Sequence, residues 1–339
     1  MDLTLTSDQE QLLAAIVDCL EGELPLARLH QPEAQRETAE VARIRTMAEL
    51  GWTRVSLPTD FGGAGLGLAE EALLFREFGR RLAPASILAI VLGGRIAALG
   101  GATGLAEDIL SGRRIVAFAT PEASVMIGET ASGPVRLFST GPADLALLVT
   151  PGAAALLDMS GAPSNPRPCL DRTLMMRSAD LASSQVLVRT DGPQVWSQAL
   201  LLLAATLTGQ AEASRDMITE YAKIRRTFGR AIGSYQAVRH PIADMAIRCE
   251  QSKCLVLYAA LSLDENRPDA GTQAAAARAI AQVAATRNDD ANIQLHGGIG
   301  VTDDLDAHLY MKRAIVYANW LGGAQQQLKA LLDAALGDI

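Results

Sequence analysis

Hydrophobic residues recur along the chain with a spacing that changes twice, and the changes divide it into three segments. The first opens with Ser7 and Glu10, whose spacing satisfies two free amides reciprocally at a helix start, and the apolar run Leu12–Leu20 follows. Further helical patterns, separated by glycine and proline, lie at Ala39–Leu50 and Leu68–Leu82. The spacing predicts an all-helical N-terminal domain over residues 1–112.

The second segment, from Arg114 to about Val188, has short runs of β-prone residues between Gly, Pro, Ser and Asp turns. The runs are Ile115–Phe118, Val135–Phe138 and Leu145–Val149. We therefore expect a small β domain over residues 113–190.

Helical spacing returns from Val195 onward and predicts a four-helix bundle over residues 191–339. One apolar stripe consists of Met217, Tyr221, Ile224 and Phe228, and a second of Val238, Ile242, Met245 and Cys249. An Ala-rich helix over Thr272–Leu295 is expected to end at Gly297–Gly298, because glycine suits a left-handed cap. One more helix is expected over His308–Trp320.

The composition strengthens the helical prediction. Of the 339 residues, 49% are hydrophobic and 20% are charged, as in an ordered globular protein. Only 4% are aromatic, while Ala and Leu abound. This balance favours helices, because unbranched side chains lose little freedom in a helix. The predicted fold class is mainly α with a small middle β domain.

Charge and hydropathy exclude several classes of function. The net charge of -8 disfavours binding to nucleic acid, which relies on clustered Lys and Arg. The acidic, polar N-terminus MDLTLTSDQEQ is unlike a secretion signal, so we expect a cytoplasmic protein. The apolar runs Ala199–Leu207 and Ile87–Gly94 fall short of the roughly 18 residues that cross a bilayer, which predicts no membrane span.

The cysteines and histidines show neither disulfide nor metal-ligand spacing. They are Cys19, Cys169, Cys249 and Cys254, and His30, His240, His296 and His308. We expect free structural thiols and no metal site.

Two motifs in the third segment carry candidate chemistry. The first is Arg225–Ile232 (RRTFGRAI), followed by Tyr235–Gln236 and Ala243–Met245, and the second is Gln294–Val301 (QLHGGIGV). A weaker pair in the first segment is Pro58–Leu66 with Gly79–Pro84. In this order, and with this sequence of domains, the chain resembles the acyl-CoA dehydrogenase family.

The resemblance implies that an arginine, a phenylalanine, glutamines and a glycine reach the ADP half of an FAD held mainly by a neighbouring subunit. The candidates are Arg225, Phe228, Gln236, Gln294 and Gly298. A guanidinium can grip pyrophosphate oxygens, an aromatic ring can pack beside adenine, and glycine lets backbone approach closely. Each also has a simpler interpretation: Phe228 as core, Arg225 as a solvated charge, Gly297–Gly298 as a helix stop. Their combination favours cofactor binding.

The catalytic base of the family does not stand at either of its usual positions. In relatives a carboxylate removes the proton α to the thioester while flavin N5 accepts a hydride from the β carbon. Most place the Glu in a turn after the bundle, where this chain has Leu321, and a minority place it where Ala199 stands. Leu200 replaces the arginine that supports CoA binding in relatives. The resemblance therefore implies no catalytic residue in this chain.

The middle segment departs from the family pattern too. Ala119–Glu122 is faintly similar to the family's T-E-P stretch, and the later flavin-cradling segments are not recognisable. The combination resembles the smaller subunit of heterotetrameric α2β2 acyl-CoA dehydrogenases of steroid side chains, in which a partner chain supplies the base and the cradle. That implies an obligate hetero-oligomer, an acyl-CoA substrate and an electron-transferring flavoprotein.

Two alternatives stay open. The chain could be a self-sufficient homomeric acyl-CoA dehydrogenase whose base lies elsewhere. It could also be a flavin-free structural or regulatory member of the family.

Overall fold

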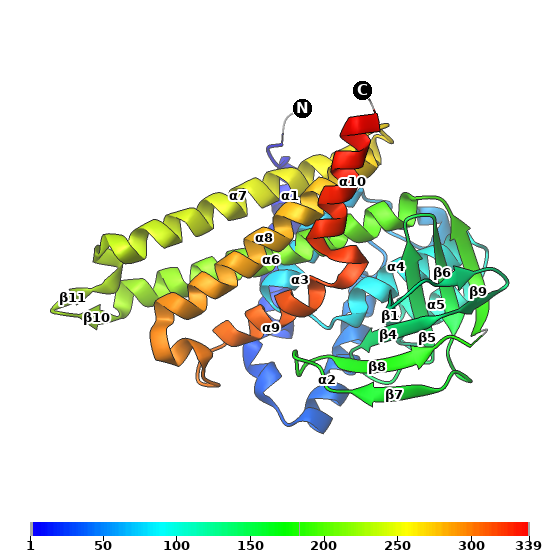
Figure 1. The fold of residues 1–339 in the computed structure, drawn as a ribbon, viewed down its shortest axis with the longest axis horizontal. Coiled ribbons are helices and arrows are strands. Elements are labelled where there is room, and N and C mark those ends of the chain that lie inside the picture. Colours follow the sequence, from blue (N-terminus) through cyan, green and yellow to red (C-terminus); the bar gives the residue numbers. More distant parts are fainter. Residues whose placement is uncertain (1–2, 183, 338–339) are drawn as a thin grey trace. The chain divides into compact units, whose positions relative to one another are not determined.

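The computed structural model describes residues 3–182 and 184–337 (Figure 1). Helices form the N-terminal part: α1 (Ser7–Glu23), η1 (Leu26–His30), α2 (Glu33–Glu49), η2 (Thr59–Phe61), α3 (Leu68–Arg80), α4 (Ser86–Leu99) and α5 (Thr103–Leu110). The predicted helices at 39–50 and 68–82 correspond to α2, which begins six residues earlier, and to α3.

The start of α1 is capped one residue earlier than predicted. The hydroxyl of Thr6 accepts a hydrogen bond from the Gln9 amide at 3.3 Å, and the Gln9 side chain accepts one from the Thr6 amide at 3.1 Å. The predicted pair of Ser7 and Glu10 is therefore wrong. Both pairs have the capping-box spacing, and only the extended backbone of Thr6 shows which residue stays outside the helix.

A nine-stranded sheet follows: β1 (Val116–Pro121), β2 (Met126–Ile127), β3 (Thr130–Ser132), β4 (Pro134–Ser139), β5 (Leu145–Thr150), β6 (Ala153–Asp158), β7 (Ser164–Arg167), β8 (Met175–Asp180) and β9 (Ser184–Asp191). Their order is β2-β3-β9-β6-β5-β1-β4-β8-β7, with β1 and β5 parallel and the other neighbours antiparallel. The three predicted strands correspond to β1, β4 and β5.

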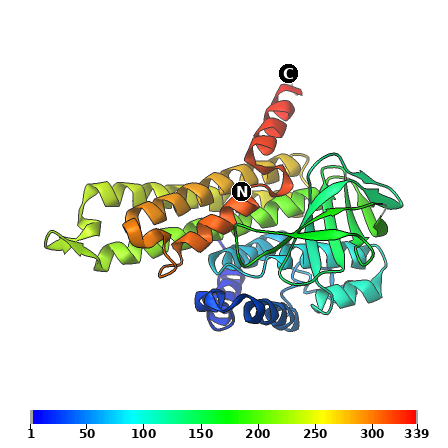
Figure 2. The ribbon, with the colours of Figure 1, turned by 60° about the horizontal axis from the view of Figure 1, so that its bottom comes forward.

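Helix α4 packs on one face of this sheet (Figure 2). All of its residues from Ser86 to Ala98 are buried, so it is apolar on every side except at Arg95. Gly93 lies at this contact, where a Cβ would be 3.4 Å from Leu156 of β6 and 3.7 Å from Val116 of β1. The opposite face of the sheet has its own core of small and aliphatic side chains, among them Val135 and Leu148.

The C-terminal part consists of long helices and short connections: α6 (Gln194–Ile224), β10 (Arg226–Thr227), β11 (Arg230–Ala231), η3 (Ile232–Ser234), α7 (Gln236–Asp264), α8 (Ala270–His296), η4 (Gly297–Val301), α9 (Ala307–Tyr317), η5 (Trp320–Gly322) and α10 (Gly323–Gly337). The predicted helices at 272–295 and 308–320 correspond to α8 and α9. The predicted fold class, mainly α with a middle β domain and a C-terminal bundle, is confirmed.

Helices α3 and α6 meet backbone to backbone within the bundle. A Cβ on Gly209 would lie 1.8 Å from the Arg76 carbonyl oxygen, and one on Gly79 would lie 1.9 Å from that of Thr206. Only glycine fits at such distances. Gly79, which belongs to the weaker N-terminal pattern, therefore has a packing role.

The chain divides into two compact units, and α3 and α6 run through both. One consists of Met1–Leu26, Ala72–Leu82 and Leu200–Ile339, and the other of Ala27–Glu71 and Ala83–Ala199. The predicted domain limits at 112 and 190 stay a prediction. Within the described part of the chain, no helix has the length and apolarity to span a bilayer, and no cluster of His, Cys, Asp and Glu could hold a metal ion.

Candidate functional site

The RRTFGRAI motif folds into a hairpin at the end of α6. The helix ends at Ile224, and the hairpin closes where the Ile232 amide donates to the Arg225 carbonyl at 2.8 Å. Between these points β10 and β11 pair antiparallel. The motif is therefore a local structure of its own and not a continuation of the helix.

Phe228 lies at the tip of this hairpin. It and Gly229 form a two-residue loop in which both have positive φ, 48° and 82°, as in a type I′ turn. A bulky residue rarely adopts this conformation. The Phe228 side chain is 97% exposed and that of Ile224 is 76% exposed. The predicted apolar stripe is therefore wrong at both positions: α6 ends before Phe228, and its last residue, Ile224, is exposed.

The three arginines of the hairpin differ in what they contact. Arg226 donates to the Gly229 carbonyl at 2.9 Å, and Arg230 lies 3.9 Å above the ring centre of Tyr235. Arg225 is exposed, and its guanidinium has no partner among the described residues. Its five donors are therefore available to a bound anion.

Gln236 is the first residue of α7, directly after the hairpin. Tyr235 caps the helix with an extended backbone but gives no side-chain hydrogen bond to its free amides. The first amides of a helix carry partial positive charge and suit an anion. Exposed Gln236 and the helix start thus add neutral donors at the same end of the bundle as Arg225.

The QLHGGIGV motif ends α8. Gly297 stops the helix at φ 71° and ψ -147°, a conformation that favours glycine but is not the predicted left-handed cap. Gly300 is required by packing, because a Cβ there would lie 2.5 Å from the Ile293 carbonyl oxygen. Gly298 has open space around it, and Gln294 is exposed. The predicted contact residues of this motif therefore face outward.

The two motifs lie at the same end of the bundle, where α6 and α8 end and α7 begins (Figure 1, left). The ring of Tyr221 in α6 packs on that of His296 in α8, with centroids 4.4 Å apart. A groove of about 640 Å³ lies beside the hairpin between α6 and α7. Its lining includes Ala222, Ala231, Ile242 and Ala243, with Lys223 and Arg239.

Leu321 lies in the turn between α9 and α10. Its backbone is left-handed (φ 55°, ψ 37°) and it is 4% exposed. Arg278, fully buried in α8, donates to the carbonyls of Tyr317 at 2.9 Å and Trp320 at 3.3 Å. Burial lowers the pKa of Arg278 to about 9. The turn is fixed by a buried cation, and an aliphatic side chain cannot accept a proton.

At the other usual base position, Ala199 and Leu200 are fully buried in α6. The preceding Gln198 accepts a hydrogen bond from Arg95 at 2.9 Å, and Arg95 contacts both carboxylate oxygens of buried Glu71 at 2.6 Å. The sequence interpretation missed this carboxylate, because an acid in the first turn of a helix is ordinary. The one signal in the sequence was Arg95, because a charged residue in the otherwise apolar α4 indicates a buried acidic partner.

The faint T-E-P match lies at the end of β1. There the Glu122 amide donates to the Pro134 carbonyl at 3.0 Å, and its carboxylate accepts from Arg136 at 2.5 Å. The amide and the carboxylate of Glu122 therefore both bond to the neighbouring strand β4.

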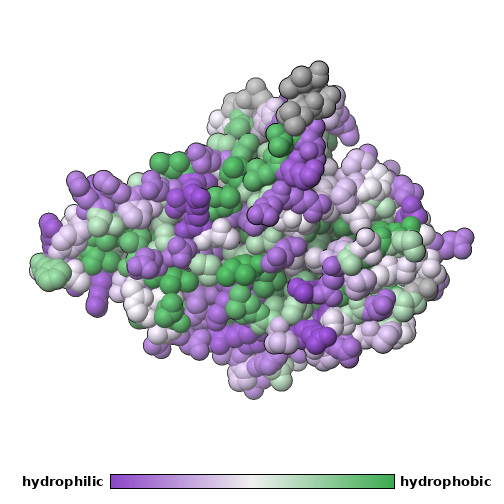
Figure 3. Space-filling view, viewed as in Figure 1, coloured by the Kyte–Doolittle hydropathy of each residue, from purple (hydrophilic) through white to green (hydrophobic). Residues whose placement is uncertain are grey.

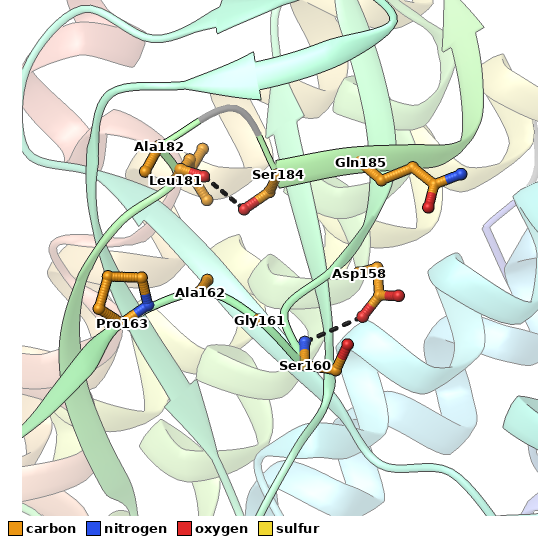
Figure 4. Close-up of a pocket in the computed structure, with 9 residues that line it drawn as sticks. All are labelled: Asp158, Ser160, Gly161, Ala162, Pro163, Leu181, Ala182, Ser184 and Gln185. Atoms are coloured by element: carbon orange, nitrogen blue, oxygen red, sulfur yellow. Dashed lines mark hydrogen bonds between the residues drawn. The ribbon is translucent and has the colours of Figure 1, made fainter.

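A separate pocket of about 280 Å³ lies between the turns β6–β7 and β8–β9 (Figure 4). Asp158 accepts the Ser160 amide at 2.9 Å, and Ser184 donates to the Leu181 carbonyl at 2.5 Å. The bonds to Ser160 hold the pKa of Asp158 below its usual value. These polar groups serve their own turns, and the pocket contains none of the predicted site residues.

Comparison with known proteins identifies the chain. Residues 6–103 match the model of the acyl-CoA dehydrogenase N-terminal domain, and residues 198–336 match that of the C-terminal domain. Acyl-CoA dehydrogenase IpdE2 of Mycolicibacterium smegmatis is 30% identical over 284 residues, which cover 84% of each chain. The chain belongs to the acyl-CoA dehydrogenase family.

Solved structures of the family share its fold. The Tcur3481-Tcur3483 steroid ACAD G363A variant is 25% identical with a TM-score of 0.81, and 99% of each chain is covered. The ChsE4-ChsE5 complex from Mycobacterium tuberculosis is 24% identical with a TM-score of 0.83 over the full length of both chains. The predicted family, its oxidoreductase class acting on acyl-CoA and its cofactor FAD are confirmed.

Proposed function

We propose that this chain is a subunit of a composite acyl-CoA dehydrogenase, in which it binds the ADP half of an FAD while a partner of the same fold supplies the base and the flavin cradle. The observation that carries the proposal is the exposed hairpin end. Phe228 holds a strained positive φ although its side chain is fully exposed, and strain of this kind gathers at functional sites. Arg225 of the same hairpin is paired by no described residue.

The hairpin end fits the ADP half chemically. Arg225 and the amides at the start of α7 can bind pyrophosphate, and Phe228 offers a ring face to adenine or ribose. Gly298, with open space around it, allows a close approach. The small side chains of the adjoining groove leave room for a flat ring beside Lys223 and Arg239.

FAD, when bound, accepts the hydride that leaves the β carbon of the acyl group. The residues of this chain hold and orient that cofactor, and none at the two usual base positions can take the α proton. Leu321 and Ala199 are aliphatic and buried. On this proposal a second chain provides the carboxylate that starts the reaction.

Exposed apolar side chains on the bundle support a protein partner. Ile280 of α8, Ile315 of α9 and Leu328 and Leu332 of α10 are 36%, 41%, 54% and 58% exposed. Figure 3 shows hydrophobic side chains at the surface over α10 and at the hairpin end. Exposed apolar surface of this kind marks interaction sites. Two structural neighbours, Tcur3481-Tcur3483 and ChsE4-ChsE5, are named as pairs, which is consistent with a hetero-oligomer.

We further propose an acyl-CoA with a bulky ring system as substrate and an electron-transferring flavoprotein as acceptor. One structural neighbour, Tcur3481-Tcur3483, is a steroid ACAD, which supports the substrate class. A composite enzyme forms fewer active sites per assembly, and this leaves more room around each.

The test is to purify the chain alone and together with acyl-CoA dehydrogenase-like chains encoded beside it, and to record mass, visible flavin absorption and dehydrogenation for each. We expect flavin and activity only in a mixed oligomer. A yellow, active homomer would favour the self-sufficient enzyme. A colourless mixed oligomer would favour the flavin-free structural member.

A further inference from the structure

A row of buried polar side chains runs between α6 and α8 inside the bundle. Three contacts define it: Ser214 Oγ donates to Asp289 Oδ1 at 2.5 Å, Asn292 Nδ2 lies 3.5 Å from Met217 Sδ, and the Tyr221 ring packs on His296. The two residues of each pair are 75 positions apart in sequence. The two helices are therefore parallel and keep one register through about two turns.

Several atoms of this row have no partner among the described residues. They are Gln210 Nε2 and Oε1, Asp289 Oδ2, Asn292 Oδ1 and His296 Nε2. Gln210, Asp289 and Asn292 are fully buried, and His296 is 6% exposed. Buried polar atoms in folded proteins are almost always hydrogen-bonded, to protein or to ordered water. So many orphan atoms in one row need an explanation.

The same register places small side chains opposite Gln210. Seventy-five positions after Gln210 stands Ala285, and Ala281 lies one turn before it; both are fully buried. Buried water needs polar partners and space for one molecule. Gln210 offers two polar atoms, and alanines occupy less of the space opposite it than larger side chains would.

The hydrogen-bonding roles match water. His296 Nδ1 lies 2.8 Å from the Asn292 carbonyl oxygen, which can only accept, so Nδ1 carries the proton and Nε2 is an acceptor. Three acceptors and the Gln210 amide donor then remain, together with Asp289 Oδ2. One water molecule donates two hydrogen bonds and accepts two, so at least two molecules are needed to serve these five atoms.

We infer that the bundle core contains a buried hydration site, in which ordered water molecules bridge Gln210, Asp289 and Asn292. Burial raises the pKa of Asp289 to about 8, with Ser214 opposing the shift, so the carboxyl is neutral at pH 7. A protonated Oδ2 donates to water, and a neutral carboxyl gives little reason for a metal cation to replace it. The site does not depend on the proposed function.

A crystal structure of the full chain, in whatever assembly it purifies, tests this inference. We expect density about 2.6–3.2 Å from Gln210 and from either Asp289 or Asn292. Rubidium soaking should add no anomalous signal there. An anomalous peak would overturn the water assignment in favour of a cation. Absent density, with the side chains bonded to one another, would overturn the site itself.

A variant gives a second measurement. Gln210→Leu keeps the approximate volume and removes two water partners. If water is present, we expect the urea midpoint to fall and the density at Asn292 to weaken. If the glutamine is simply unsatisfied, the same change removes a buried polar group and the midpoint should rise. Thr208→Val is the comparison variant, because the Thr208 hydroxyl already bonds to the Ala204 carbonyl and to Ser252. Its midpoint should fall whether or not water is present, while the density at Asn292 stays unchanged.

Discussion

Helix α8 connects two regions of opposite character. At its C-terminal end, Gln294 and Gly298 are exposed beside a hairpin that holds Phe228 in water. In its N-terminal half, Arg278 is fully buried beneath the turn that contains Leu321. The first region leaves its side chains open to solvent, whereas the second satisfies its own carbonyls. The difference separates the proposed FAD-binding surface from the position that we propose has lost the catalytic base.

The largest expected effect concerns pH and the buried row between these regions. Asp289 accepts a hydrogen bond from Ser214 on α6, and its neighbour Asn288 contacts Arg248 and Cys249 on α7. Its pKa is raised to about 8 in the folded protein, so its contribution to stability is present below about pH 4 and is lost as pH rises toward 8. We expect a fall of several kcal/mol over this window.

Asp289→Asn should remove that part of the pH dependence, since the amide does not titrate. The measurement is the free energy of unfolding by urea, taken every pH unit for both proteins. If the free energy of unfolding depends on pH in the same way in both proteins, the pKa of Asp289 is not shifted by folding.

The next largest effect is on protein stability, through the packing of the glycine loop that follows α8. Gly300→Ala places a Cβ 2.5 Å from the Ile293 carbonyl oxygen and should cost about 2–3 kcal/mol of stability. Gly298→Ala meets nothing within 4 Å and should stay within about 0.5 kcal/mol. Thermal unfolding of the two variants checks the pair. Equal losses would mean that the loop does not pack as described.

Cofactor retention should respond to Arg225. Arg225→Ala removes a charge-assisted contact to pyrophosphate and should weaken FAD binding by about 2 kcal/mol, or about 30-fold. Arg113→Ala is the control, because this exposed arginine lies outside the proposed site and pairs with Asp108 at 2.8 Å. Flavin content of the purified complex is the readout. An unchanged content in Arg225→Ala would remove that residue from the site.

Phe228 should show opposite effects on stability and binding. Phe228→Asn places a residue that tolerates positive φ at the hairpin tip and should raise stability by about 1 kcal/mol or less. It should also reduce FAD retention, since the ring is lost. Phe228→Tyr keeps the ring and should change neither. The measurements are the unfolding midpoint and the flavin content of the unaltered chain, Phe228→Asn and Phe228→Tyr. Equal flavin content in all three would remove the Phe228 ring from the site.

The smallest expected effect is at the disused position. Leu321→Glu in the lone chain should give no dehydrogenation above that of Leu321→Gln, which cannot act as a base. A carboxylate alone does not supply a flavin cradle or CoA contacts. Robust turnover by Leu321→Glu would show that both are intact and would break the contrast between the two regions.

The sequence by itself determined the family, the order of helical, β and helical parts, and the side chains at the two base positions. These features are local: a helix period, a β-prone run or a motif lies within a few neighbouring residues. The same local information failed at Phe228, because periodicity cannot show that α6 ends at Ile224.

Only the tertiary structure decided which buried polar groups meet. Glu71, Arg95 and Gln198 come together from three helices, and Ser214 meets Asp289 across 75 positions. No short pattern encodes such pairs, because their free energy depends on burial and on partners far away in the sequence. The spacing of apolar residues determines which side chains are buried. The packing of the helices determines which partner each buried polar group contacts.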